Sequence, residues 1–230
     1  MRTPKHSPLR PDGRRRTVML LMSNALDCDA LSLWCTHRLE CDTVECGTDL
    51  GRGLERCEAF RPRLLALDPT ITRDAIERST TALRARVFDH LLILDSRPFE
   101  VRLADILPVP GSSYISRAAS PAALASAISE ILLNDTRVFD PALAHRVSKT
   151  KQGYKLAASS KTSLLALLSR RERQIMRLLA EGMTVSRCAQ ALGLSHSTVD
   201  NHKSRLMGKL GVHKASELTV RAIQEGLIQL

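Results

Sequence analysis

The sequence has few aromatic residues and no long apolar run. Only 3% of its 230 residues are aromatic, and one of them is tryptophan. Proteins that hold single-stranded nucleic acid stack its bases on exposed rings, so this scarcity argues against such a platform. No apolar stretch is long enough to cross a bilayer, and no apolar signal core follows the basic start of the chain. We therefore expect a cytoplasmic protein with no membrane partner.

Motifs for thiol, metal and catalytic chemistry are also missing. The group Cys35, His37, Cys41 and Cys46 has no standard zinc spacing, so we expect no metal site. The cysteines of a cytoplasmic protein are expected to be reduced and to pack as small hydrophobic side chains. No nucleophile–base pair, phosphate-binding loop or full set of metal ligands is recognisable, which indicates that the protein is not an enzyme. The six cysteines are Cys28, Cys35, Cys41, Cys46, Cys57 and Cys188.

Positive charge is abundant and unevenly placed. The formal net charge is +10, which suggests a polyanionic partner. Residues 17–145 carry 13 basic and 18 acidic residues, whereas residues 164–230 carry ten basic and five acidic ones. An acidic first part and a basic last part fit a DNA-binding protein whose regulatory half avoids the phosphates.

Short apolar runs alternate with helical patterns in the first part of the chain. This alternation predicts an α/β fold, a doubly wound parallel five-stranded sheet with helices on both faces. The predicted strands are residues 17–23, 42–46, 63–67, 90–94 and 113–116, and the predicted helices are residues 25–39, 52–60, 72–86, 100–106 and 121–133.

Polar residues follow several of these strands, at the sheet edge where the sites of such folds gather. This spacing resembles a response-regulator receiver domain, and residues 114–128 are especially similar to that family's last strand and helix. The resemblance implies a candidate phospho-acceptor at Asp68 and switch positions at Ser96 and Arg117, where the family has a hydroxyl residue and a lysine. The strand-end residues are Ser23, Asn24, Asp68, Asp95, Ser96 and Arg117.

The same resemblance identifies a gap at the family's metal site. Where the family has an acidic pair that holds Mg²⁺, the chain has Ser23 and Asn24. Mg²⁺ prefers carboxylate oxygens, and phosphoryl transfer depends on a metal to neutralise developing charge. We therefore expect no cofactor and little phosphorylation of Asp68. This residue is then either an ordinary strand-end aspartate or the partner of Arg117 in a fixed ion pair.

Composition divides the chain into four segments. Residues 1–16 are basic and contain several prolines, which is typical of a disordered tail. Residues 17–134 form the receiver-like domain. Residues 135–163 are polar and cationic, and we expect a linker that is mostly loop, with a helical turn at residues 141–147. Residues 164–230 are predicted to form a small all-α domain of four helices.

A helix-turn-helix is predicted within this last domain. A short helix begins at Thr184 and ends at Gly193, and Ser195 is a good N-cap for the next helix, residues 196–210. In such a motif the second helix enters the major groove of DNA.

Two stretches of the same domain, residues 168–182 and 198–211, resemble the LuxR-type (NarL/FixJ) DNA-binding domain. Ser169 and Glu172 form a capping box at the start of its first helix. The resemblance implies that the helix from Thr198 reads the major groove and that the last helix often mediates dimerisation.

Helical angles separate two faces of the 196–210 helix. Val199, Leu206 and Leu210 share the buried face. We assign base contacts to the opposite side: Asn201 suits adenine, and Asp200 either accepts from cytosine or pairs with Lys203. The candidates for base contacts are Asp200, Asn201 and Ser204. The candidates for phosphate contacts are Thr184, Ser197, Thr198, His202, Lys203, Arg205 and Lys209.

These patterns together predict a sequence-specific transcription regulator that binds double-stranded DNA as a homodimer. Its further partners would be a sensor kinase or RNA polymerase. Two alternatives stay open. One is a conventional two-component response regulator phosphorylated on Asp68, and the other is an interaction adaptor that has lost DNA binding.

Overall fold

The computed structural model describes residues 15–96, 100–150, 153–156, 167–225 and 227–228. These residues form two compact units. The first contains the described residues up to 96 and from 106 to 156, and the second contains residues 100–105 and those from 167 onward. None of the helices in the described ranges is long and apolar enough to cross a membrane.

The first unit is built on a parallel sheet of five strands, in the order β2-β1-β3-β4-β5. This confirms the predicted fold, and all five strands lie where the sequence placed them. The central strands are buried on both faces, which explains their continuous apolar sequences. The strands are β1 (Thr17–Leu21), β2 (Thr43–Gly47), β3 (Leu64–Leu67), β4 (His90–Asp95) and β5 (Ser112–Ser116).

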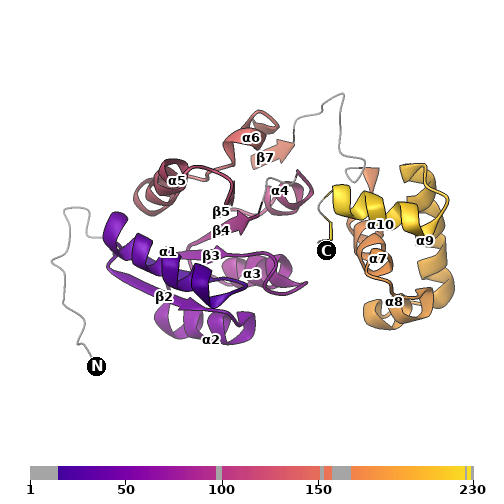
Figure 1. Ribbon diagram of the computed structural model, residues 1–230, viewed down its shortest axis with the longest axis horizontal. Helices are drawn as coiled ribbons and strands as arrows, with labels where there is room; N and C mark the ends of the chain where they lie inside the picture. Colours follow the sequence, from indigo (N-terminus) through magenta and orange to yellow (C-terminus); the bar gives the residue numbers. More distant parts are fainter. Residues whose placement is uncertain (1–14, 97–99, 151–152, 157–166, 226, 229–230) are drawn as a thin grey trace. The chain divides into compact units, whose positions relative to one another are not determined.

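Helices alternate with these strands along the chain and cover both faces of the sheet (Figure 1). On one face, α1 and α5 pack over alternate residues of the strands in one apolar cluster. On the other face, α2 lies so close to β1 that Gly53 faces the side chain of Leu21 without a Cβ between them. The helices of the first unit are α1 (Ala25–Arg38), α2 (Leu50–Phe60), α3 (Ala75–Arg84) and α5 (Pro121–Asn134), whereas most of α4 (Glu100–Ile106) belongs to the second unit.

The segment after α5 has more structure than its composition predicted. The expected helical turn is α6 (Pro141–Ala144), but a two-stranded antiparallel hairpin follows, β6 (Val147–Thr150) and β7 (Gly153–Leu156). The expectation of loop there was wrong because a few side chains pack locally. The rings of Phe139 and Tyr154 lie 5.0 Å apart, and the guanidinium of Arg137 lies 4.9 Å from the Tyr154 ring centre. The rest of the predicted linker, and most of the predicted tail, lies outside the described residues.

The second unit contains the four predicted helices. They enclose a core of their own that includes Ile175, Met176, Val199 and Leu206, all fully buried. Ser169 and Glu172 form the predicted capping box at the start of α7. The helices are α7 (Arg170–Ala180), α8 (Val185–Leu192), α9 (His196–Leu210) and α10 (Ala215–Gln224).

Candidate nucleic-acid interface and strand-end site

The turn between α8 and α9 is set by a glycine and a serine. Gly193 ends α8 in the left-handed conformation, with φ of 62°, which glycine adopts without strain. Ser195 then begins α9, because its hydroxyl accepts the backbone N–H of Thr198 at 3.1 Å. Arg171 of α7 donates to the carbonyl of Leu192 at 2.9 Å and so ties the end of α8 to α7. These contacts fix the angle at which α9 leaves the turn.

Helix α9 has one buried face and one polar face, as its helical angles predict. Val199 and Leu206 are fully buried and Leu210 nearly so. The opposite face is solvent-exposed and polar, and it includes Gly208, where an added Cβ would meet no atom within 4 Å. Within the described part of the second unit, this face is therefore open to solvent, as a groove-binding role requires. The exposed residues are Ser197, Asp200, Asn201, Ser204 and Gly208.

The candidates for phosphate contact lie around the rim of that face. His202, Lys203 and Thr198 are half-buried along its flank. Thr184 is exposed at the start of α8, where its hydroxyl accepts the backbone N–H of Arg187 at 3.3 Å. The N-terminus of α8 adds the unpaired N–H groups and partial positive charge that favour a phosphate. Ser197, Arg205 and Lys209 are exposed.

Lys209 has a protein partner that sequence reasoning missed. Its ammonium lies 2.7 Å from Oε2 of Glu172, whose residue is 4% exposed. The same carboxylate accepts the backbone N–H of Ser169 at 2.7 Å. Burial raises the pKa of Glu172, but the hydrogen bonds from Lys209 and Ser169 outweigh it, so its pKa lies below its usual value. The pair joins α7 to α9 and draws Lys209 toward the protein.

In the first unit, the strand-end residues meet at Asp68, which is fully buried at the end of β3. Its Oδ2 accepts from the Ser23 hydroxyl at 2.6 Å and from Nη2 of Arg117 at 3.2 Å. Its Oδ1 accepts from Thr70, through the hydroxyl at 2.6 Å and the backbone N–H at 2.8 Å. Burial raises the pKa of Asp68, but these donors and the Arg117 charge outweigh it and lower the pKa. Both carboxylate oxygens are therefore occupied.

Arg117 bridges two carboxylates, because it also pairs with Asp27. Asp27 lies in the first turn of α1, where Asn24 is the N-cap and accepts the Asp27 backbone N–H at 2.8 Å. The Asn24 amide also donates to Asp27 Oδ2 at 2.9 Å. The predicted Asp68–Arg117 pair is thus present within a larger network that joins α1, β3 and the end of β5.

At the end of β4, the buried polar contact is made by Asp95 and not by the predicted switch residue Ser96. Ser96 is exposed just beyond the strand. The fully buried residue at the strand end is Asp95, whose Oδ2 accepts from the Tyr114 hydroxyl at 2.9 Å. Tyr114 is fully buried on the neighbouring strand β5. No sequence signal pairs these two residues, because their contact depends on the register of β4 with β5.

Sequence reasoning also missed Thr70, although a signal for it existed. Residues Asp68, Pro69 and Thr70 form a short turn, and such aspartates commonly accept from the residue two positions on. Within the residues that the structure describes, no group of three or more His, Cys, Asp or Glu side chains is arranged to hold a metal ion.

Comparison with known proteins bears directly on α9, whose polar face follows a tight glycine turn. Residues 166–222 match the profile of a family described as bacterial regulatory proteins, luxR family. Over these residues the second unit is similar to the luxR family. Its α8 and α9 have the order helix, glycine turn, helix of a helix-turn-helix.

Relatives extend the similarity into the first unit. The response regulator UvrY of Escherichia coli K12 is 30% identical over 124 residues, 54% of this chain and 55% of UvrY. The chain thus spans about half the length of this relative. The DNA-binding transcriptional activator DevR/DosR of Mycobacterium tuberculosis is 26% identical over 186 residues, 80% of this chain and 83% of that protein.

A solved structure is similar in fold over most of the chain. RcsB of Salmonella enterica serovar Typhimurium, solved bound to a promoter, is 18% identical with a TM-score of 0.66. The match covers 89% of this chain and 96% of RcsB. At this identity the likeness shows the fold alone.

Proposed function

We propose that this chain is a sequence-specific DNA-binding transcription regulator of the response-regulator type, acting as a dimer, and that it is not an enzyme. The observation that carries the proposal is the exposed polar face of α9 in a luxR-type domain. The name of the relative DevR/DosR, a DNA-binding transcriptional activator, supports the same role. RNA polymerase is the further partner that such a role implies.

The geometry of α9 supports separate sets of side chains for base contacts and for phosphate contacts. Asn201 and Asp200 are exposed on the polar face, where they would meet base edges. Lys203 and Arg205 flank that face and would contact phosphates on either side of the groove. Lys209 is already paired with Glu172, so we assign it a smaller share of phosphate binding than Lys203.

We further propose that the receiver-like unit is not controlled by Mg²⁺-dependent phosphorylation of Asp68. A receiver-type metal site needs carboxylate oxygens that are free to face the ion. Here Asp68 is saturated by Ser23, Thr70 and Arg117, and Asp27 is engaged by Arg117. The guanidinium supplies the positive charge that a metal would otherwise bring, so these residues do not fit Mg²⁺. A sensor kinase is then not required for control.

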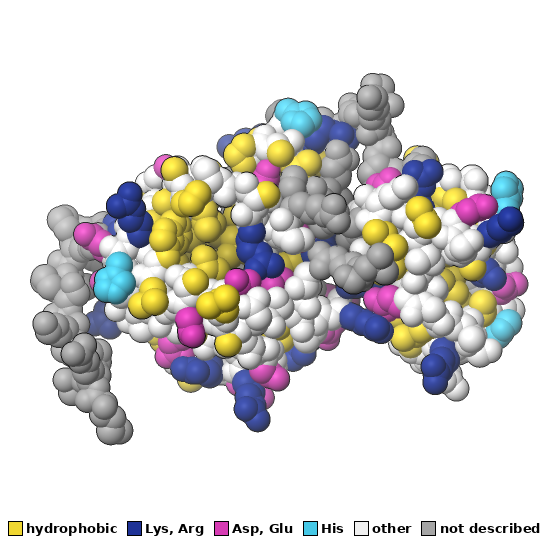
Figure 2. Space-filling model, in the orientation of Figure 1, with side chains coloured by type: hydrophobic (Ala, Val, Ile, Leu, Met, Phe, Trp, Pro, Cys, Tyr) yellow, Lys and Arg dark blue, Asp and Glu magenta, His cyan; other side chains and the backbone are white. Residues whose placement is uncertain are grey.

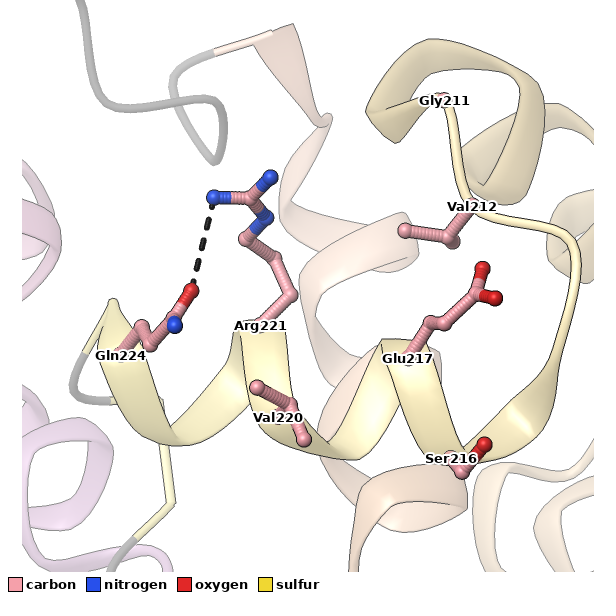
Figure 3. A pocket seen from close by; sticks show the side chains of 7 residues that line it. All are labelled: Gly211, Val212, Ser216, Glu217, Val220, Arg221 and Gln224. Atoms are coloured by element: carbon pink, nitrogen blue, oxygen red, sulfur yellow. Dashed lines mark hydrogen bonds between the residues drawn. The ribbon is translucent and has the colours of Figure 1, made fainter.

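Dimerisation on DNA follows from the short reach of one recognition helix, since two half-sites are needed for useful specificity. Helix α10 offers a surface for it. Val220 is 53% exposed there, beside a shallow hollow (Figure 3). The hollow is lined by Gly211, Val212, Ser216, Glu217, Val220, Arg221 and Gln224.

Selection from random duplex DNA tests the DNA-binding role. The full chain is incubated with a randomised library at moderate salt, and bound duplexes are recovered from gel shifts and sequenced. We expect enrichment of a sequence with two related half-sites. A folded chain that enriches no sequence would contradict the proposal and favour an adaptor that docks a protein partner.

Intact-mass measurement after incubation with Mg²⁺ and acetyl phosphate tests the second part of the proposal. We expect no stoichiometric phosphate adduct. An adduct that disappears in Asp68→Asn would instead establish a conventional response regulator.

A further inference from the structure

Four of the six cysteines lie in one place, between α1 and the strand that follows it. Cys28 and Cys35 are on α1, and Cys41 and Cys46 belong to the connection and to β2. All four pack in or against the apolar cluster that joins α1 to the sheet. Their sequence spacing predicts only small buried side chains, because it does not show that the four thiols share one interface.

One pair, Cys28 and Cys46, combines proximity with partial exposure. The Cys28 thiol donates at 3.2 Å to the carbonyl of Gly47, the residue next to Cys46, and both side chains pack where α1 meets β2. Cys46 is half-buried, and β2 is an edge strand of the sheet, against which α1 packs (Figure 1). Cys46 is therefore partly open to solvent, and a second thiol lies close by.

We propose that Cys28 and Cys46 form a redox-sensitive dithiol site, at which a peroxide forms a disulfide between α1 and β2. Peroxide first oxidises the Cys46 thiol to a sulfenic acid and releases water. The Cys28 sulfur then attacks the Cys46 sulfur, and the hydroxyl leaves as a second water with the Cys28 proton. Two thiols and one hydrogen peroxide thus give one disulfide and two waters.

The other thiols are poorer candidates because they are shielded. Cys35 and Cys41 also touch each other, but Cys35 is fully buried and Cys41 is 7% exposed. Their mutual hydrogen bond, together with burial, raises the pKa of Cys35. Cys57 is fully buried on α2, and burial raises its pKa to about 12. A protonated thiol out of reach of solvent reacts slowly with peroxide.

The proposed bond would act on the strand-end network. Cys28 is adjacent to Asp27, which holds Arg117 and through it Asp68. Tying this turn of α1 to β2 would constrain that network, and so replace the missing phosphate as an input. This consequence rests on the proposed DNA-binding function, whereas the disulfide itself does not.

Peptide mapping of the oxidised full chain tests the site. The reduced protein is treated with hydrogen peroxide under native conditions, and free thiols are then alkylated in denaturant. The chain is cut with trypsin and also at aspartate, because Cys28 and Cys35 share one tryptic peptide and Cys41 and Cys46 share another. The peptides are analysed by mass spectrometry. We expect a Cys28–Cys46 cross-link with the other four cysteines alkylated. Cys46→Ser should abolish the cross-link, and the matched control Cys57→Ser should keep it.

A native chain that stays fully alkylated, or that gives other pairings or a mixture, would overturn the proposal. Because mapping needs no DNA, its failure is distinct from a failure of DNA binding. The second measurement is affinity for the selected duplex, compared between reduced and oxidised chains. We expect it to change, and the change to vanish in Cys46→Ser. Equal affinities would refute the regulatory consequence.

Discussion

Single residues determine how the strand-end network behaves. A buried carboxylate is stable only when its oxygens are satisfied, and Asp68 meets this condition with five hydrogen bonds from Ser23, Thr70 and Arg117. Among the described residues, Arg117 is the only basic residue that forms an ion pair with Asp68. Its geometry suits two carboxylates at once, which a lysine ammonium would not match as well.

Replacing Arg117 should therefore destabilise the first unit. Arg117→Gln leaves Asp27 and the buried Asp68 without a cation, and we expect a loss of about 2 kcal/mol in the free energy of unfolding. Because the pKa of Asp68 is lowered in the fold, its stabilisation is present above its unfolded pKa and is lost as pH falls through the folded value. The variant should lose less stability than the wild type on acidification below about pH 4.

Urea unfolding at pH 7 and at pH 3.5 measures both effects. Arg84→Gln, which removes an exposed arginine at the end of α3, is the matched control and should change little. Equal stability of Arg117→Gln and wild type at pH 7 would show that the network contributes nothing.

On α9, two substitutions should separate base reading from phosphate binding. Lys203→Ala is expected to weaken binding to all duplexes and to reduce the salt slope of the dimer by about two, because each protomer loses one phosphate contact. Asn201→Ala is expected to change which sequence is preferred. Binding titrations on selected and scrambled duplexes measure both, with Lys149→Ala on β6 as a charge-matched control. An unchanged slope for Lys203→Ala would make its phosphate role wrong.

At the scale of elements, the packing of α2 on β1 depends on a missing side chain. A Cβ at Gly53 would lie 2.3 Å from Cδ2 of the fully buried Leu21. Gly51, on the same helix, has only ordinary contacts, the nearest at 3.4 Å. The packing of α2 therefore requires a glycine at position 53 but not at position 51.

Gly53→Ala should destabilise the protein by about 1–3 kcal/mol, because the core must shift to admit the methyl group. Gly51→Ala should be neutral or stabilising by up to about 1 kcal/mol, since alanine favours the helix. Thermal unfolding of the two variants checks this difference. Equal shifts in both would indicate that α2 packs less closely than the structure shows.

At the same scale, the ion pair of Glu172 with Lys209 connects α7 to α9. Glu172→Gln keeps the shape but removes the charge, and we expect a loss of about 1–2 kcal/mol at pH 7. The lowered pKa of Glu172 makes its contribution full above about pH 4.5 and lost as pH falls through the folded value. The variant should therefore be less sensitive to acid.

Urea unfolding of the full chain, followed by a probe on the second unit, checks this effect between pH 7 and pH 3. Asp200→Asn, which removes an exposed carboxylate on α9, serves as the comparison. If Glu172→Gln and wild type lost stability in parallel on acidification, the titration of Glu172 would not be linked to folding.

For the whole molecule, DNA affinity should depend steeply on salt. A dimer that places Lys203 and Arg205 of each protomer on phosphates neutralises four of them, which gives a log–log slope of about −4, or about −5 if Lys209 also takes part. Fluorescence anisotropy titrations at salt concentrations from about 50 to about 200 mM measure this slope. By the same rule, a slope of about −2 would indicate that one protomer binds alone.

The order of helices and strands was predictable from the sequence because it depends on patterns among neighbouring residues. Continuous apolar runs marked β1, β3 and β4, and helical spacing with glycine and serine punctuation marked the four helices of the second unit. The two faces of α9 followed from helical angles alone, as the burial of Val199 and Leu206 confirms. Asp68 with Arg117 was also predictable, because parallel strands bring their carboxyl ends to one edge.

Only the tertiary structure decided which groups satisfy one another. Asp27 completes the contacts around Arg117, and Glu172 pairs with Lys209, through distances that no local pattern records. The meeting of Cys28 with Cys46 likewise depends on how α1 docks on β2. Local propensity follows from neighbours along the chain, whereas pairing of charges and thiols follows from burial, which excludes water and makes each polar group depend on the partner that the fold provides.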